Sequence, residues 1–147
     1  MRKLKAADSL KKSASQQREC FPIPILVVIC GGLEHYDKKK DIILNPTVII
    51  EVLSDSTEVF DRNDKFTRYK MFNETLTDYV LVSQNMPMVE HFIRQDDNSW
   101  KVFTHIGLDK VCNIASIECE LELSEIYDRV KFSKKTLKFL KEIANIK

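Results

Sequence analysis

A glutamate inside an apolar stretch is the first candidate for chemistry in this sequence. Glu51 interrupts TVIIEVL at residues 47–53, a stretch that is otherwise β-branched and aliphatic and predicts a buried strand. Burying a lone carboxylate is costly, so Glu51 needs a metal ion, a cation or hydrogen-bond donors beside it, or a place at the open end of the strand. The position alone leaves a structural ion pair and a functional carboxylate as equal alternatives.

The segment after this strand offers a cation on a helix. Residues 54–57 read SDST, which is typical of a helix N-cap, and residues 58–72 contain neither Gly nor Pro. We therefore expect a helix of about four turns there. Asp61, Lys65 and Tyr69 are spaced four residues apart, so they share one face of that helix.

Lys65 is the natural partner of Glu51, because a helix that returns across its parent strand brings its side chains over that strand's end. Asp61 lies one turn before Lys65 and can hold the lysine by an ion pair, which contributes about 0.3–0.5 kcal/mol if it is exposed. Taken alone, Lys65 is more typical of a solvated helix lysine. Asp61 could equally cap the helix or pair with Arg62 or Arg68.

The histidines and cysteines are weaker candidates. His91 and His105 fall within predicted strands, where a structural or exposed role is more typical than metal binding, and His35 stands apart from both. The cysteines form no CxxC pair and no zinc-like spacing with histidine, so we expect reduced thiols in a cytoplasmic protein. A Gly-rich phosphate loop and a serine nucleophile elbow are both absent from the sequence. The cysteines are Cys20, Cys30, Cys112 and Cys119.

Most of the elements that must position these residues are strands. The run FPIPILVVIC is apolar throughout and predicts a strand buried on both faces. Strands outnumber helices and one helix lies between core strands, so we predict an α/β or α+β fold with a mixed sheet. We expect strands at 21–30, 47–53, 77–83 and a hairpin of 88–94 with 99–106, then one or two short strands within 111–123, a helical turn at 124–127 and a surface helix from 131 onward.

Length and charge bound the class of protein. A chain of 147 residues predicts one domain, and 23 Lys+Arg against 22 Asp+Glu exclude a strongly basic whole-chain DNA-binding footprint. No apolar run approaches the roughly 18 residues that span a bilayer, and no secretory signal is present, so we expect no membrane partner. Residues 1–20 are basic and polar and predict a flexible segment, either a solvated tail or a DNA-contacting arm; residues 21–147 form the predicted domain.

The stretch from residue 45 to residue 69, NPTVIIEVLSDSTEVFDRNDKFTRY, resembles the core of a known family. A Pro-led strand ends in Glu-Val-Leu-Ser from Glu51, a Ser-Thr pair follows, and Asp-Arg-x-x-Lys-x-x-x-Tyr runs from Asp61 to Tyr69. This pattern resembles the Uma-type family of restriction-endonuclease-like proteins, within the PD-(D/E)XK nuclease superfamily. The resemblance continues in DYVLV at 78–82 and covers roughly residues 24–130.

The resemblance implies a restriction-endonuclease-like mixed sheet with flanking helices and a metal-dependent DNA endonuclease. In such an enzyme Glu51 would bind Mg²⁺ or Mn²⁺, which polarises the scissile phosphate and helps to generate hydroxide from water. In the superfamily the catalytic lysine usually stands two residues after the glutamate, and in this sequence that position is occupied by Leu53. The family places this lysine on the following helix instead, which corresponds to Lys65, with Asp61 in support.

The sequence departs from the family pattern in the preceding strand. The family has Pro-Asp there, and this Asp is a main metal ligand, but here the pair is Pro24-Ile25. Isoleucine cannot bind Mg²⁺, which requires oxygen ligands. The acids Glu34, Asp37 and Asp41 fall in a predicted loop, so we do not expect them to replace it.

This departure leaves an alternative to the nuclease. The family's region before this strand is not recognisable in residues 1–23, so we expect a domain that is incomplete at its N-terminus, with impaired activity. The alternative is a degenerate, non-catalytic member of the family. It would bind nucleic acid through Lys38–Lys40 and the basic segment, or form a homodimer through apolar surface left exposed.

Overall fold

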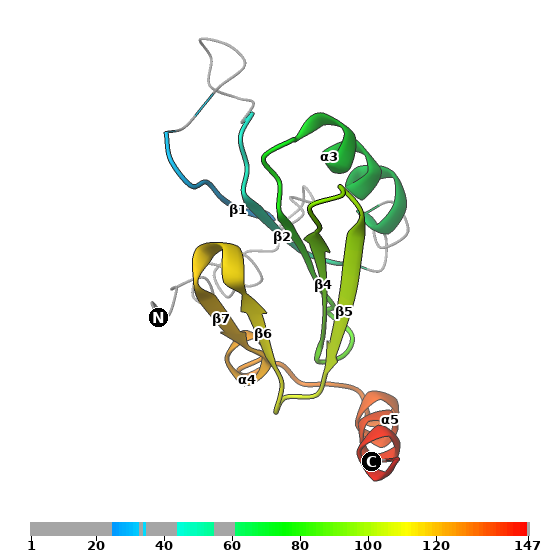
Figure 1. Ribbon diagram of the computed structural model, residues 1–147. Helices are drawn as coiled ribbons and strands as arrows, with labels where there is room; N and C mark the ends of the chain where they lie inside the picture. The colour runs from blue at the N-terminus through cyan, green and yellow to red at the C-terminus, as the bar shows by residue number, and fades with distance from the viewer. Residues whose placement is uncertain (1–24, 33, 35–43, 55–60, 147) are drawn as a thin grey trace, which may run out of the picture.

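A five-stranded mixed sheet is the main element of the fold. The computed structural model describes residues 25–32, 34, 44–54 and 61–146, and for residues 61 and 62 it describes the backbone alone. Strands β2 and β3 are parallel and the other neighbours are antiparallel, which confirms the predicted α+β class with a mixed sheet. In sheet order the strands are β1 (Ile25–Val28), β2 (Val48–Val52), β3 (Asp78–Val82), β4 (Met88–Arg94) and β5 (Trp100–Ile106) (Figure 1).

The connection between β2 and β3 carries the helix that faces Glu51. Two parallel neighbours require a crossover, and here it contains a π-helical turn, η1 (Asp61–Lys65), followed by α3 (Phe66–Phe72). Phe66 is buried and stacks on Tyr79 of β3, with 4.7 Å between ring centroids. This contact fixes the start of α3 against one face of the sheet. The expected helix at 58–72 is confirmed from residue 61 onward, and residues 58–60 lie outside the described part of the chain.

A β-hairpin covers the other face of the sheet. Its buried and exposed residues alternate, as expected for strands with one face on a core. The hairpin and α3 lie on opposite sides of the five-stranded sheet (Figure 1). The hairpin consists of β6 (Val111–Ile114) and β7 (Cys119–Glu122), joined by the 3₁₀ turn η2 (Ala115–Ile117) and followed by α4 (Leu123–Ile126).

The sheet divides the apolar core into two parts, because successive side chains of a strand point to opposite faces. We call the side covered by β6 and β7 the hairpin face, and the side covered by α3 the helix face. The hairpin face packs Val48, Ile50, Val80, Val82 and Val89 against Cys112, Ile114 and Leu121 of the hairpin. The helix face packs Ile49, Leu53, Tyr79 and Leu81 against Phe66.

Strand β1 corrects one prediction. The apolar run at residues 21–30 predicted a strand buried on both faces, but β1 begins at Ile25, whose side chain is 42% exposed, and the rest of β1 is half-buried. The reason is topological: β1 is at the end of the strand order and pairs only with β2. Residues 1–24, with the basic segment, and Lys38–Lys40 lie outside the described residues.

The chain ends in the predicted surface helix, α5 (Lys134–Asn145). Ser133 caps its start, since its hydroxyl accepts a hydrogen bond of 3.1 Å from the backbone N–H of Thr136. None of its residues is buried, and it extends away from the sheet (Figure 1). Over the described ranges, no helix has both the length and the apolar character needed to cross a bilayer.

Candidate functional site

Glu51 and Lys65 form an ion pair on the helix face of the sheet. Glu51 lies within β2 with its side chain fully buried, and Lys65 ends the turn η1 with its side chain 14% exposed. The Nζ atom of Lys65 lies 2.7 Å from Oε1 of Glu51. The crossover therefore brings the lysine to the carboxylate, as the sequence predicted. Helical turns of the π type are rare in proteins, and those that occur often lie at functional sites.

Two tyrosines complete the surroundings of this carboxylate. The hydroxyl of Tyr79, from the neighbouring strand β3, donates to Oε2 of Glu51 at 2.8 Å. The hydroxyl of Tyr69, from α3, donates to Oε1 at 3.2 Å. Both oxygens of Glu51 are thus engaged, one by Tyr79 and the other by Lys65 and Tyr69. These contacts meet the requirement that a buried carboxylate be paired and hydrogen-bonded.

The sheet register shows which residue faces Glu51 from β1. Ile25 is the direct partner of Glu51 in the antiparallel β1–β2 pair. Directly opposite residues in such a pair point to the same face, with Cβ atoms about 4.5–5.5 Å apart. An acidic side chain at position 25 would therefore stand beside Glu51 on the helix face. The isoleucine is placed where a second carboxylate would converge with the first.

The other acids of the sequence analysis do not join this group in the described residues. Asp61 begins η1, but its side chain lies outside the described part of the chain, so its contact with Lys65 stays a prediction. Glu34 is exposed and follows the Val28 end of β1, whereas Glu51 pairs with the opposite end. Residues 37 and 41 lie outside the described ranges.

The donor set around Glu51 fits Mg²⁺ in chemical type but is small. Mg²⁺ is often bound through one or two carboxylates, with water and substrate phosphate as further ligands. Glu51 offers one carboxylate, and the weaker of its contacts at Oε1, the 3.2 Å bond from Tyr69, is the one that a metal ion would most easily displace. Among the described side chains, Glu51 belongs to no cluster of three or more ligand groups.

A second polar group lies on the hairpin face. Nε2 of His91, from β4, lies 2.6 Å from Oδ1 of Asp78 at the start of β3, and both side chains are buried. Ser116 of η2 and Thr77 donate hydrogen bonds to the other oxygen of Asp78. Burial raises the pKa of Asp78, but the hydrogen bonds from His91, Ser116 and Thr77 outweigh burial, so this pKa lies below its ordinary value.

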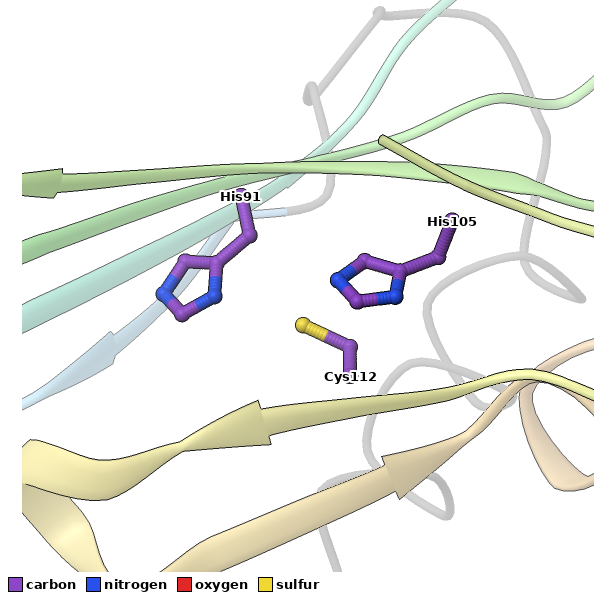
Figure 2. Close-up of side chains that lie close together, drawn as sticks. All are labelled: His91, His105 and Cys112. Carbon is purple, nitrogen blue, oxygen red and sulfur yellow. The ribbon is translucent and has the colours of Figure 1, made fainter. Parts of the chain in front are cut away.

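His91 has two further neighbours with metal-binding chemistry. The ligand atoms of His91, His105 and Cys112 all lie within 4.8 Å of one another, and these residues come from β4, β5 and β6 (Figure 2). Burial lowers the pKa of His105, and His91 lowers it further. Burial, with Asp78 and Cys119 nearby, raises the pKa of Cys112 to about 12. Without a metal ion, the Cys112 side chain is therefore a protonated thiol at neutral pH.

The sequence does not predict this second group, although part of the signal for it is present. The hairpin of 88–94 with 99–106 was predicted, and in its register Val89 is opposite His105 and His91 is opposite Phe103. The two histidines are therefore diagonal neighbours on one face. The packing of β6 onto that face, which adds Cys112, depends on tertiary contacts that no local pattern encodes.

Comparison with known proteins identifies the family. The Uma2 family model, described as "Putative restriction endonuclease", matches residues 6–124. The chain belongs to the Uma2 family. The matched range includes both the Glu51–Lys65 pair and the group on the hairpin face.

Two curated relatives of this Uma2 chain come from Synechocystis sp. (strain ATCC 27184 / PCC 6803 / Kazusa). The uncharacterized protein slr1290 is 33% identical over 112 residues, which cover 76% of this chain and 57% of the relative. The uncharacterized protein sll1609 is 33% identical over 91 residues, which cover 62% of this chain and 51% of the relative. The chain spans about half the length of the curated relatives it matches.

A solved structure is also similar to the Uma2 chain. It is described as a putative nuclease belonging to DUF820 from Anabaena variabilis ATCC 29413. The similarity has a TM-score of 0.49 at 11% sequence identity, and it covers 65% of this chain and 53% of that chain.

Proposed function

We propose that this Uma2 chain is a metal-dependent DNA endonuclease of the restriction-endonuclease type, which hydrolyses phosphodiester bonds. The observation that carries the proposal is the ion pair of Lys65 and Glu51, at 2.7 Å, in a chain of the family described as "Putative restriction endonuclease". Glu51 is the proposed metal ligand and Lys65 the proposed catalytic lysine. Asp61, one helical turn earlier in sequence, is the proposed support for Lys65.

In this proposal Lys65 and the two tyrosines have different roles. The Lys65 ammonium places positive charge beside the reacting phosphate, where it stabilises the negative charge that develops in the transition state. Tyr79 and Tyr69 hold the Glu51 carboxylate in one orientation through its two oxygens. Mg²⁺, when bound, would supply Lewis-acid polarisation of the phosphate and a more acidic bound water.

A specific observation favours a second candidate function, a non-catalytic nucleic-acid-binding member of the family. Ile25 faces Glu51 in the register position where a second carboxylate would converge. Glu51 is also fully buried, with both oxygens already engaged. In this candidate the ion pair is structural, and the domain binds nucleic acid or a second copy of itself without cutting.

Nicking of supercoiled plasmid with Mg²⁺ or Mn²⁺ tests the two candidates directly. The proteins to compare are wild type, Lys65→Ala, Ile25→Asp and Ile25→Asp/Lys65→Ala. An endonuclease nicks the plasmid as wild type, stops when a chelator is added, and loses about 10²–10³ in rate in Lys65→Ala, the usual effect of losing one electrostatic donor. Ile25→Asp should increase the rate, because it adds a second oxygen ligand.

Lys70→Ala is the matched control. Lys70 belongs to the same helical segment as Lys65, but its ammonium lies over the Phe66 ring rather than beside Glu51. The Lys70→Ala variant should nick at the wild-type rate, and circular dichroism should confirm that each variant is folded. If only Ile25→Asp cuts, and Lys65→Ala abolishes that activity, wild type is a non-catalytic member of the family, as the second candidate requires. If no folded protein in the set cuts, the assignment of Glu51 and Lys65 to phosphodiester chemistry is wrong.

A further inference from the structure

The group on the hairpin face has the composition of a transition-metal site. We propose that His91, His105 and Cys112 bind Zn²⁺ between the five-stranded sheet and the β6–β7 hairpin. This site is separate from the Glu51–Lys65 pair, which lies on the helix face of the same sheet. The proposal is independent of whether the chain cuts DNA.

The ligand atoms converge from three different strands. Figure 2 shows a ring nitrogen of His91, a ring nitrogen of His105 and the sulfur of Cys112 pointing toward a common point. His91 and Cys112 are buried, and His105 is partly exposed near the end of the edge strand β5. Such convergence places two imidazoles and a sulfur around one volume, with the backbone of each ligand held by a strand.

Asp78 gives His91 the orientation that a metal ligand needs. Because Oδ1 of Asp78 lies 2.6 Å from Nε2 of His91, the carboxylate accepts a hydrogen bond from Nε2–H. The lone pair is then on Nδ1, which is directed at the group (Figure 2). Histidines that bind metals usually donate their other N–H to a carboxylate or carbonyl, which fixes the tautomer and the ring. Asp78 is itself held by Ser116 and Thr77, so it acts as a positioning residue.

The donor types select the metal. Imidazole and thiolate ligands suit Zn²⁺, whereas Mg²⁺ and Ca²⁺ take oxygen ligands. In a tetrahedral zinc site the bond lengths of about 2.0–2.3 Å place ligand atoms roughly 3.3–3.7 Å apart. The ligand atoms lie within 4.8 Å of one another, so they need to move together by at most about 1.5 Å, which the partly exposed His105 side chain can do.

Zn²⁺ binding would release one proton and leave one coordination position for a further ligand. The Cys112 thiol releases its proton to solvent as the sulfur bonds to Zn²⁺, since the thiolate is the ligand form. With three ligands from the described residues, the fourth tetrahedral position is taken by water, on the side where His105 is exposed. Three protein ligands and one open position are the arrangement of zinc sites that bind a further small ligand.

Cobalt substitution of the full chain tests the site. Wild type stripped of metal and titrated with Co²⁺ should develop a thiolate-to-cobalt charge-transfer band and tetrahedral d–d absorption, and Zn²⁺ should then displace the cobalt at one ion per chain. Cys112→Ser should lose the charge-transfer band. Asp78→Asn should keep the band but weaken Co²⁺ affinity about 10–100-fold, the usual cost of losing a partner that orients a metal ligand.

Controls separate loss of a ligand from loss of the fold. Cys119→Ser removes the other buried cysteine of the hairpin and should leave the band intact. His105→Asn should weaken Co²⁺ binding at least ten-fold, whereas Thr104→Ala, at the exposed neighbouring position of β5, should not. The zinc site is wrong if folded wild type shows no band and retains no Zn²⁺ after desalting. It is equally wrong if the band survives Cys112→Ser or is lost in Cys119→Ser.

Discussion

At the scale of single residues, Glu51 shows how the chain accommodates a charge inside a strand. The side chain is fully buried, and Lys65, Tyr69 and Tyr79 engage both of its oxygens. Replacing a buried ion pair by apolar groups is often neutral, whereas removing one partner leaves an uncompensated charge and costs about 3–5 kcal/mol. Loss of the partner of Glu51 should therefore destabilise the fold.

A double-mutant cycle measures this dependence. Lys65→Met alone should lower the free energy of unfolding by about 3–5 kcal/mol, because it leaves the buried Glu51 carboxylate without its cation. Adding Glu51→Gln removes the uncompensated charge, so the double variant should regain a large part of the lost free energy of unfolding. Denaturant unfolding of wild type, both single variants and the double variant gives the coupling energy. Strictly additive losses would contradict the buried pair.

The sequence could predict this pair but not its whole environment. Glu51 within an apolar strand and Lys65 on the next helix are visible in a local pattern, and the family resemblance pointed to the same residues. Tyr79 is not visible in this way, because its approach to Glu51 depends on which strand lies beside β2. The same reason hid the group of His91, His105 and Cys112, which only the register of β4 with β5 and the packing of β6 bring together.

At the scale of elements, α3 is held on the sheet by aromatic packing. The ring of Phe66 stacks on Tyr79 at 4.7 Å, lies 4.6 Å from the ring of Phe92, and meets Trp100 edge-on at 5.1 Å. Lys65 immediately precedes Phe66, so this packing also determines where the lysine stands relative to Glu51. The strand β1 was harder to predict, because an apolar sequence does not show whether a strand will be central or at an edge.

Truncation of Phe66 should show this anchoring. Phe66→Ala should destabilise the domain by about 3–5 kcal/mol, through lost burial and the cavity that it leaves. Phe72→Ala is the control, since Phe72 is on the same helix with its side chain 76% exposed, and its effect should be within about 0.5 kcal/mol. Thermal and urea unfolding give both values. Similar losses for the two variants would mean that α3 is not anchored through Phe66.

Tyr127 makes a second link between elements, at the end of α4. Its buried hydroxyl lies 2.7 Å from the carbonyl oxygen of Ser83, just after β3, and 2.8 Å from that of Met88, the first residue of β4. Burial raises the pKa of Tyr127, and this outweighs the smaller lowering by backbone hydrogen bonds with Met88 and Ser83. The buried phenol is therefore neutral in the folded protein at a pH where a tyrosine of the unfolded chain already ionises, at about 10.

The raised pKa of Tyr127 gives a prediction for alkaline pH. A folded-state pKa above the unfolded value contributes stability that is present below pH 10 or so and is lost as pH rises through the folded value. Tyr127→Phe should cost about 0.5–1.5 kcal/mol near neutral pH, from the lost hydrogen bond. The substitution should also remove the part of the stability loss at alkaline pH that comes from ionisation of Tyr127. Urea midpoints from pH 7 to 11 test this, and parallel pH curves for both proteins would contradict it.

At the scale of the whole molecule, one sheet separates two kinds of chemistry. The helix face carries the Glu51–Lys65 pair and the hairpin face carries the proposed zinc ligands, with β2, β3 and β4 contributing to both cores. The metals proposed for the two sites also differ, since one site offers a carboxylate and the other offers imidazole and thiol. The two sites should therefore respond independently to metal removal and to mutation.

Zinc removal should reveal this separation as a change in thermal stability. Cys112 belongs to the hairpin and the histidines to the main sheet, so a bound metal ion adds a link between two elements that also meet through apolar packing and the Ser116–Asp78 hydrogen bond. An ion at 100 times its dissociation constant stabilises the folded state by about 2.7 kcal/mol, which is roughly 5–10 °C for a chain of this size. In buffer without Mg²⁺, chelation should lower the unfolding midpoint by that amount in wild type and in Ile25→Asp, but not in Cys112→Ser. An equal shift in Cys112→Ser would place the ion elsewhere, and a shift that changed with Ile25→Asp would mean that the two faces are coupled through the sheet.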